Sequence, residues 1–205
     1  MPDLEHTPDN TRQAILEAAF EEMYEHGFQA ASLSRILERV DVTKGALYHH
    51  FSSKKELGYA VVDEVVGKWV TEQWQFDAES PDPISSIRRT VEGALERACE
   101  RTCHCGCPLN NLAQEMSPID EGFRERINGV FRLWRTKFEV AFRAGQKAGT
   151  VRSDVEVEKL AAFVVASFEG IVGLGKNEQS LELVRSTLDV LLDYLETLRP
   201  QPVAV

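Results

Sequence analysis

Apolar residues recur every three or four positions along almost the whole chain, and no segment alternates at every second position. The first spacing is typical of helices with one buried face, and the second of half-buried strands. The sequence therefore predicts an all-α protein. Breaks are expected at "DAESPDP" (77–83) and "CHCGCP" (103–108). Helices are expected at residues 12–26, 54–76, 84–101, 109–116, 157–174 and 181–198, and a long helix from 123 is expected to end near "AGQKAGT" (144–150).

The net charge, the first ten residues and the longest apolar run limit the class of protein and its location. The chain of 205 residues carries 33 Asp and Glu against 23 Lys and Arg, a net charge of -10. This balance argues against non-specific coating of nucleic acid or of an anionic membrane, so any DNA contact has to be local. The start, "MPDLEHTPDN", lacks the order of a secretory signal, and the longest apolar run (160–175) is too short to span a bilayer and contains Glu169. We expect a cytoplasmic protein with no membrane partner.

The segment "SLSRILERVDVTKGALYHHF" (32–51) has the form of a helix-turn-helix. Ser32 and Thr43 are placed to cap its two helices, and Leu47 and Phe51 to point inward. A further helix starts after Ser52 or Ser53, where backbone amides and Lys54 suit a phosphate group. The side left for solvent or a DNA groove consists of Lys44, Gly45, Tyr48 and His49.

Residues 12–57, and above all "KGALYHHF..K..L", resemble the TetR family of transcriptional repressors. The resemblance implies a three-helix DNA-binding head at residues 11–57, a larger helical effector-sensing and dimerisation body at 58–199, and flexible ends at 1–10 and 200–205. It also implies a homodimer that leaves double-stranded operator DNA when a small effector binds. Two positions depart from the pattern, Asp41 in place of glycine and Ala31 in place of threonine. The DNA contacts implied are Ser32, Thr43, Lys44, Gly45, Tyr48, His49 and Lys54.

In TetR-like proteins the last two helices form the dimer interface, which here implies residues 157–174 and 181–198 and a palindromic operator. On the last helix the interface is expected at Leu181, Val184, Leu188, Leu191 and Leu195.

No βαβ pattern surrounds a Cys-x-x-Cys pair, so we expect that the chain is not an enzyme. Aromatic candidates for the lining of an effector pocket are Trp69, Trp74, Phe123, Phe131 and Trp134.

All four cysteines of the chain fall within "CERTCHCGCP" (99–108). Three interpretations remain open: small buried hydrophobes, a site for a soft metal such as Cu(I) or Zn, and reactive thiols. The second would make the chain a metal-responsive repressor or a thiol and metal buffer; otherwise no cofactor is expected. Its ligands would come from Cys99, Cys103, His104, Cys105 and Cys107.

For the third interpretation, "GCPLNNLAQEM" is similar to a TetR subgroup related to the N-ethylmaleimide reductase repressor, which responds to electrophiles and oxidants. Cys107 takes the position of that subgroup's reactive cysteine, and Lys176 matches a lysine that would favour a thiolate. Cys103 or Cys105 would then resolve a sulfenic acid to a disulfide.

Overall fold

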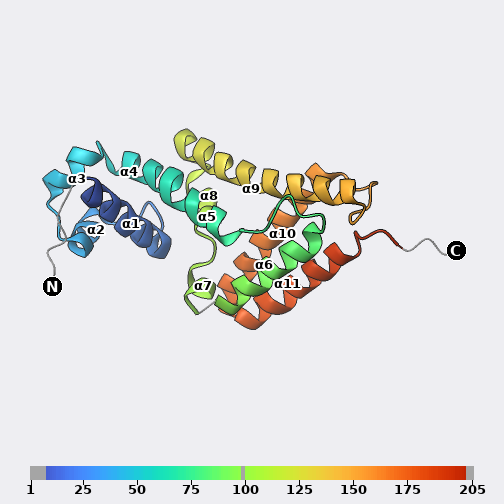
Figure 1. Cartoon of the computed structure of the whole chain (residues 1–205). Helices are drawn as coiled ribbons and strands as arrows, with labels where there is room; N and C mark the ends of the chain where they lie inside the picture. The colour runs from blue at the N-terminus through green and yellow to red at the C-terminus, as the bar shows by residue number, and fades with distance from the viewer. Residues whose placement is uncertain (1–7, 98–99, 202–205) are drawn as a thin grey trace, which may run out of the picture. The chain divides into compact units, whose positions relative to one another are not determined.

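The computed structural model describes residues 8–97 and 100–201, and within these ranges every regular element is a helix (Figure 1). The prediction of an all-α fold is confirmed. No helix in this part of the chain is long and apolar enough to cross a membrane. The elements are α1 (Pro8–His26), α2 (Leu33–Val40), α3 (Lys44–His50), α4 (Lys54–Ala60), a π-helical turn η1 (Val61–Val66), α5 (Gly67–Gln73), α6 (Pro83–Arg97), α7 (Glu100–Cys105), α8 (Pro108–Met116), α9 (Glu121–Ala148), α10 (Val157–Glu178) and α11 (Leu181–Glu196).

Most helix boundaries differ by a few residues from those that the sequence predicts, for example α1 begins at Pro8 and α11 ends at Glu196. Three differences are larger or change the element. The run expected at 54–76 ends at Gln73 and includes the π-helical turn η1. The break expected at 103–108 is shorter, because α7 continues to Cys105 and α8 begins at Pro108. Helix α10 runs on past 174 to Glu178. Gly175, inside this extra turn, lies close to α11: a Cβ there would lie 2.1 Å from Cγ2 of Val184.

The chain divides into two compact units, and the first consists of residues up to Trp69 together with Pro108–Val130. Helix α1 packs against α2, α3, α4 and η1. Residues 58–69 and 108–130 therefore belong with the helix-turn-helix, although the sequence suggested a single boundary at residue 57. Its fully buried side chains include Ile15, Leu16, Ile36, Leu47, Leu57 and Phe123.

The second unit consists of Val70–Cys107 and Phe131–Val205. Helix α10 packs along α11, and α11 also packs against α6, so that these three helices lie side by side (Figure 1). Helix α7 packs on α10 as well. The buried side chains of this unit include Trp74, Ile84, Ile87, Trp134, Phe138, Phe142, Leu188 and Leu192.

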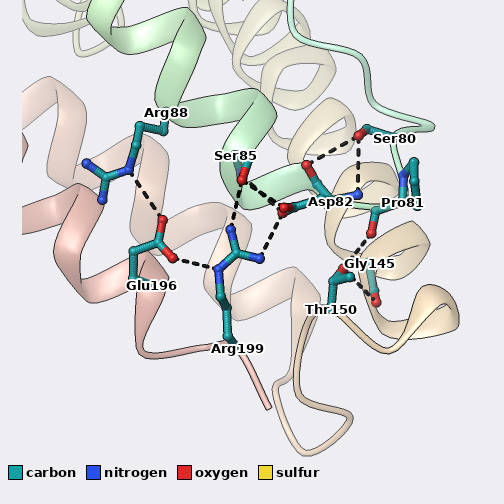
Figure 2. Close-up of polar contacts among 9 residues, drawn as sticks. All are labelled: Ser80, Pro81, Asp82, Ser85, Arg88, Gly145, Thr150, Glu196 and Arg199. Carbon is teal, nitrogen blue, oxygen red and sulfur yellow. Dashed lines mark hydrogen bonds and ion pairs between the residues drawn. The ribbon is translucent and has the colours of Figure 1, made fainter. Parts of the chain in front are cut away.

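A polar network joins the end of α11 to the start of α6 (Figure 2). The Arg199 guanidinium donates to Asp82 Oδ1 at 3.0 Å, to Ser85 Oγ at 2.9 Å and to Glu196 Oε2 at 2.6 Å. Burial alone would raise the pKa of Asp82, but hydrogen bonds from Ser85 and Arg199 outweigh it and lower that pKa. The network thereby holds the start of α6 and the end of α11 together.

Candidate DNA interface and cysteine site

The helix-turn-helix forms with the caps that its sequence predicts. The Ser32 hydroxyl accepts from the Arg35 backbone N–H at 3.4 Å, and the Thr43 hydroxyl accepts from that of Ala46 at 3.2 Å. Between the two helices Asp41 takes the left-handed conformation, with φ 50°. Asp can adopt this conformation more readily than most residues, so the turn forms without glycine.

The outward side of α3 is the candidate DNA-reading surface. Leu47 and Phe51 are buried, as expected. Lys44, Gly45, Tyr48 and His49 are all exposed. The Lys44 ammonium lies 5.8 Å from the Tyr48 ring centroid, so a cation and an aromatic ring stand side by side on this surface. A side chain pair of this kind can reach a phosphate and a base edge together.

Lys54 lies in a different environment from the one that the sequence suggests. Its ammonium donates to the Gln29 carbonyl oxygen at 3.0 Å and lies 4.9 Å from the Phe28 ring centroid. Burial lowers its pKa, although Glu115 and Glu22 oppose that effect. Lys54 thus holds the loop between α1 and α2 in this structure, and its contact with DNA stays a prediction.

Glu22 is a buried residue of the helix-turn-helix that the sequence analysis missed. Its Oε1 accepts from the Ser32 backbone N–H at 2.9 Å and from Arg35 Nε at 2.7 Å. Burial by itself would raise the pKa of Glu22, but these hydrogen bonds and the Arg35 charge outweigh burial, so the pKa is lowered. The signal was available: Glu22 stands at helical spacing from Ile15 and Ala18 on the buried stripe of α1.

Glu115 was also missed, and it joins α8 to the loop between α1 and α2. Its Oε2 accepts from the Phe28 backbone N–H at 2.8 Å, and its Oε1 from that of Gln29 at 2.7 Å. A Cβ on Gly27, which has φ +79°, would lie 2.8 Å from Oε2. No local pattern could have indicated a contact across more than 80 residues.

The described cysteines are buried thiols beside α10. Cys103, Cys105 and Cys107 are each about 5% exposed. His104 is exposed instead, with Nδ1 at 3.1 Å from Oε1 of Gln179. Among the described residues no three His, Cys, Asp or Glu side chains are grouped so as to hold a metal ion, and Cys99 lies outside the described residues. The expected metal ligands are therefore not brought together in the part of the chain described.

Lys176 lies against the residue that precedes Cys107. A Cβ on Gly106, which has φ +74°, would lie 2.9 Å from Cδ of Lys176. The Gln179 amide donates to the Lys176 carbonyl oxygen at 2.5 Å, where α10 ends. The structure thus brings the Lys176 stem to the Gly106–Cys107 break.

Glu169 is a further buried group at this site that the sequence analysis did not assign. It is 7% exposed, and within the described residues neither carboxylate oxygen has a hydrogen bond of ordinary geometry. Burial raises its pKa to about 7, and a polar contact from the Cys107 side chain opposes that rise. The thiol thus lies near the carboxyl group without forming a well-aligned hydrogen bond.

The aromatic residues proposed for an effector pocket fall into two groups. In the second unit the Trp134 ring centroid lies 5.2 Å from that of Trp74 and 6.3 Å from that of Phe131. Phe123 instead packs on Phe28, at 4.6 Å between ring centroids, and Trp69 also belongs to the first unit. The proposed lining therefore needs correction, because Phe123 is fully buried in another core.

Three of the five interface residues expected on α11 lie in the core of the chain itself. Leu188, Leu191 and Leu195 are at most 8% exposed, because α6 and α10 of the same chain cover this side of α11. Leu181 and Val184 are half-buried. The large apolar side chains that these two helices leave exposed are Phe163 (49%), Leu174 (54%), Val190 (67%) and Tyr194 (42%), and the rings of Phe163 and Tyr194 are in contact.

Two family models match the chain. One is described as bacterial regulatory proteins, tetR family, and matches residues 15–61. The other is described as tetracyclin repressor-like, C-terminal domain, and matches residues 83–191, more than half of the chain.

Individual relatives agree with the family models. The HTH-type transcriptional repressor DhaR of Mycobacterium sp. (strain GP1) is 26% identical over 185 residues, which cover 90% of this chain and 91% of the relative. The transcriptional regulator AcuR of Cereibacter sphaeroides is 27% identical over 168 residues, 81% of this chain and 76% of the relative.

Solved structures show the same fold. The regulatory protein TetR from Rhodobacter sphaeroides has a TM-score of 0.78 at 25% identity and covers 90% of this chain and 98% of its own. E. coli NemR in reduced form has a TM-score of 0.77 at 21% identity and covers 95% of this chain and 100% of its own.

Proposed function

Because the chain belongs to the TetR family of bacterial regulatory proteins, it is a transcriptional regulator rather than an enzyme, and we propose that it represses transcription as a homodimer on a palindromic operator. The observation that carries this proposal is the outward side of α3. Lys44, Gly45, Tyr48 and His49 are exposed there on a helix that Leu47 and Phe51 fix to the core. A helix presented in this way enters the major groove in helix-turn-helix proteins.

The exposed apolar residues of α10 and α11 support the homodimer. Phe163, Leu174, Val190 and Tyr194 lie on two adjacent helices, whereas scattered single apolar residues are ordinary on a protein surface. A second copy of the chain that packs on this face would remove them from water. One helix-turn-helix contacts few base pairs, so pairing two of them supplies the affinity and the two-fold symmetry of the operator.

We assign effector sensing to Cys107. Its resemblance to the reactive cysteine of an electrophile-responsive subgroup is joined by two features of position. Cys107 stands in the break between α7 and α8, and it is followed directly by Pro108, the first residue of α8. Helix α8 carries Glu115, which binds Phe28 and Gln29 of the loop that precedes the helix-turn-helix. A modification that displaces the start of α8 would therefore act on the placement of that loop and on DNA affinity.

DNA selected by the full-length protein from random duplexes tests the first part of the proposal. We expect a two-fold symmetric motif and a complex with two chains on one duplex. A motif without symmetry, or a complex with a single chain, would contradict it.

Release of the selected duplex tests the sensing part. N-ethylmaleimide and p-benzoquinone should release the parent protein from the duplex, and the Cys107→Ser variant should stay bound in the presence of either compound. Cys105→Ser is the matched control: it removes a neighbouring buried thiol, and alkylation of Cys107 needs no resolving cysteine, so this variant should be released from DNA by N-ethylmaleimide as the parent is. Equal release from the parent and from Cys107→Ser would overturn the assignment, and release by Zn²⁺ or Cu(I) alone would favour the metal-responsive alternative.

A further inference from the structure

Glu169 interrupts the most apolar helix of the chain with a group that is costly to bury. On helix α10 it follows four residues after the buried Val165 and so shares a buried face with it. A carboxylate without hydrogen-bond partners in such a place destabilises the fold, and replacement by an apolar residue would remove that cost. In the described part of the chain neither of its oxygens has a well-formed hydrogen bond, so packing does not account for it.

The position of Glu169 relates it to the Gly106–Cys107 break. Glu169 and Lys176 are seven residues apart on α10, which places them on one face at about 10 Å along the axis. The Lys176 stem lies against Gly106, and the Cys107 side chain makes its polar contact with Glu169. The break thus crosses α10 with Lys176 beside Gly106 and Glu169 beside Cys107.

We propose that Glu169 is the proton acceptor of Cys107: its carboxylate takes the thiol proton as the sulfur adds to an electrophilic carbon. This inference rests on the proposed function of Cys107 as the sensing residue. It assigns to Glu169 a chemical role in the response to one class of effector, α,β-unsaturated carbonyl compounds.

The step balances without an oxidant or a reductant. The S–H bond of Cys107 and the π bond of the electrophile break, an S–C bond forms, and the proton passes to Glu169. The resulting enolate is then protonated at carbon, either by the Glu169 carboxylic acid or by water. The product is a thioether on Cys107, and Glu169 is again a carboxylate.

The acid–base properties of Glu169 suit this role. Since burial raises its pKa to about 7, it is present in both protonation states near neutral pH, where a general base is most effective. Helix α7 and the break bring Cys103, His104, Cys105 and Cys107 to α10, which itself carries Lys176. On α9, Trp134 contacts Phe168, and the charged residues next to Trp134 are Arg135 and Lys137, of which Lys137 donates to the Trp74 carbonyl oxygen. The charged groups of α11 are exposed or half-buried.

The rate of alkylation of Cys107 tests the proposal directly. In full-length protein with Cys99→Ser, Cys103→Ser and Cys105→Ser, N-ethylmaleimide can modify only Cys107, and mass spectrometry follows the reaction from pH 5 to 9. We expect the rate to rise through an inflection near pH 7. Glu169→Gln should slow the reaction by roughly 100-fold at pH 7 and remove that inflection.

Two further variants separate the proton transfer from a structural effect. Glu169→Asp keeps a carboxyl group and should restore part of the rate, whereas Glu178→Gln, at an exposed position of α10, should leave rate and pH profile unchanged. An unchanged or faster reaction in Glu169→Gln would overturn the inference. It would show that the carboxylate only accepts a hydrogen bond from the thiol and does not remove its proton during alkylation. If alkylation of the parent fails to release the operator, the proposed function fails instead, whatever the rate.

Discussion

Glu115 Oε1 accepts a 2.7 Å hydrogen bond from the backbone N–H of Gln29, whose carbonyl oxygen in turn accepts from the Lys54 ammonium. One peptide of the loop between α1 and α2 is therefore held from two sides, by α8 and by α4. The helix-turn-helix begins only three residues later, at Ser32. The loop that leads into the helix-turn-helix is thus held by a carboxylate far away in the sequence.

Glu115→Gln is expected to destabilise the protein by about 2 kcal/mol, because it replaces two charge-assisted hydrogen bonds by one neutral bond and places an amide N–H against a backbone N–H. Operator affinity should fall as well, since the loop loses its support. Chemical denaturation and fluorescence anisotropy with labelled operator measure the two effects. Gln114→Ala, at an exposed position of the same helix, serves as the control and should change neither quantity.

Lys44→Ala and Tyr48→Ala are expected to weaken operator binding without loss of helix content or thermal stability. Both side chains are exposed, so their removal leaves no cavity. If Lys44 contacts a phosphate, the slope of log affinity against log salt concentration should fall in magnitude by roughly one, while Tyr48→Ala leaves the slope unchanged. Lys147→Ala, an exposed lysine on α9, is the control for net charge. Wild-type affinity in both α3 variants would show that DNA is read by another surface.

The helices and the caps of the helix-turn-helix could be predicted because their causes are local in the sequence. Ser32 and Thr43 cap helices from three residues away, and Leu47 and Phe51 follow the helical spacing. The position of Asp41 in the left-handed region likewise follows from a single residue type. Periodicity and capping therefore accounted for the scaffold of the candidate DNA interface.

The dimer face and the cysteine site depend on contacts that spacing does not contain. Leucine spacing on α11 shows which residues share a face, but not whether the same chain or a second copy covers that face. Leu188 and Leu191 face the protomer's own core, and Val190 is left outside. In the same way, a lone Glu169 in an apolar run gives no sign that Cys107 is its neighbour.

Val190→Glu is expected to shift the protein from dimer to monomer, because a charge would enter an apolar interface without a partner. Operator affinity should fall with it, while helix content stays unchanged. Analytical ultracentrifugation measures the assembly. Leu133→Glu is the matched control: Leu133 is 70% exposed on α9, outside the face formed by α10 and α11.

Leu188→Glu separates this face from the protomer core. Leu188 is 2% exposed, so the charge should unfold the protomer rather than release a folded monomer. A folded monomer from Leu188→Glu, together with a dimer from Val190→Glu, would place the interface on the opposite face of α11.

The free energy of unfolding of the second unit is expected to depend on pH through the titration of Glu169. Its pKa is raised from an ordinary value of 4.5 to about 7, so between these values the folded state binds more protons than the unfolded state. The free energy of unfolding contributed by this group is therefore greatest in acid and is lost as the pH rises through 7. The free energy of unfolding of Glu169→Gln, relative to that of the parent, should therefore increase by roughly 2 to 3 kcal/mol from pH 5 to pH 8.

Urea denaturation at one fixed protein concentration, well above that at which the dimer dissociates, measures the difference. Glu178→Gln, exposed on the same helix, should follow the parent at every pH, and a Glu169→Gln profile parallel to the parent would show that the buried carboxyl group titrates as it does in the unfolded chain.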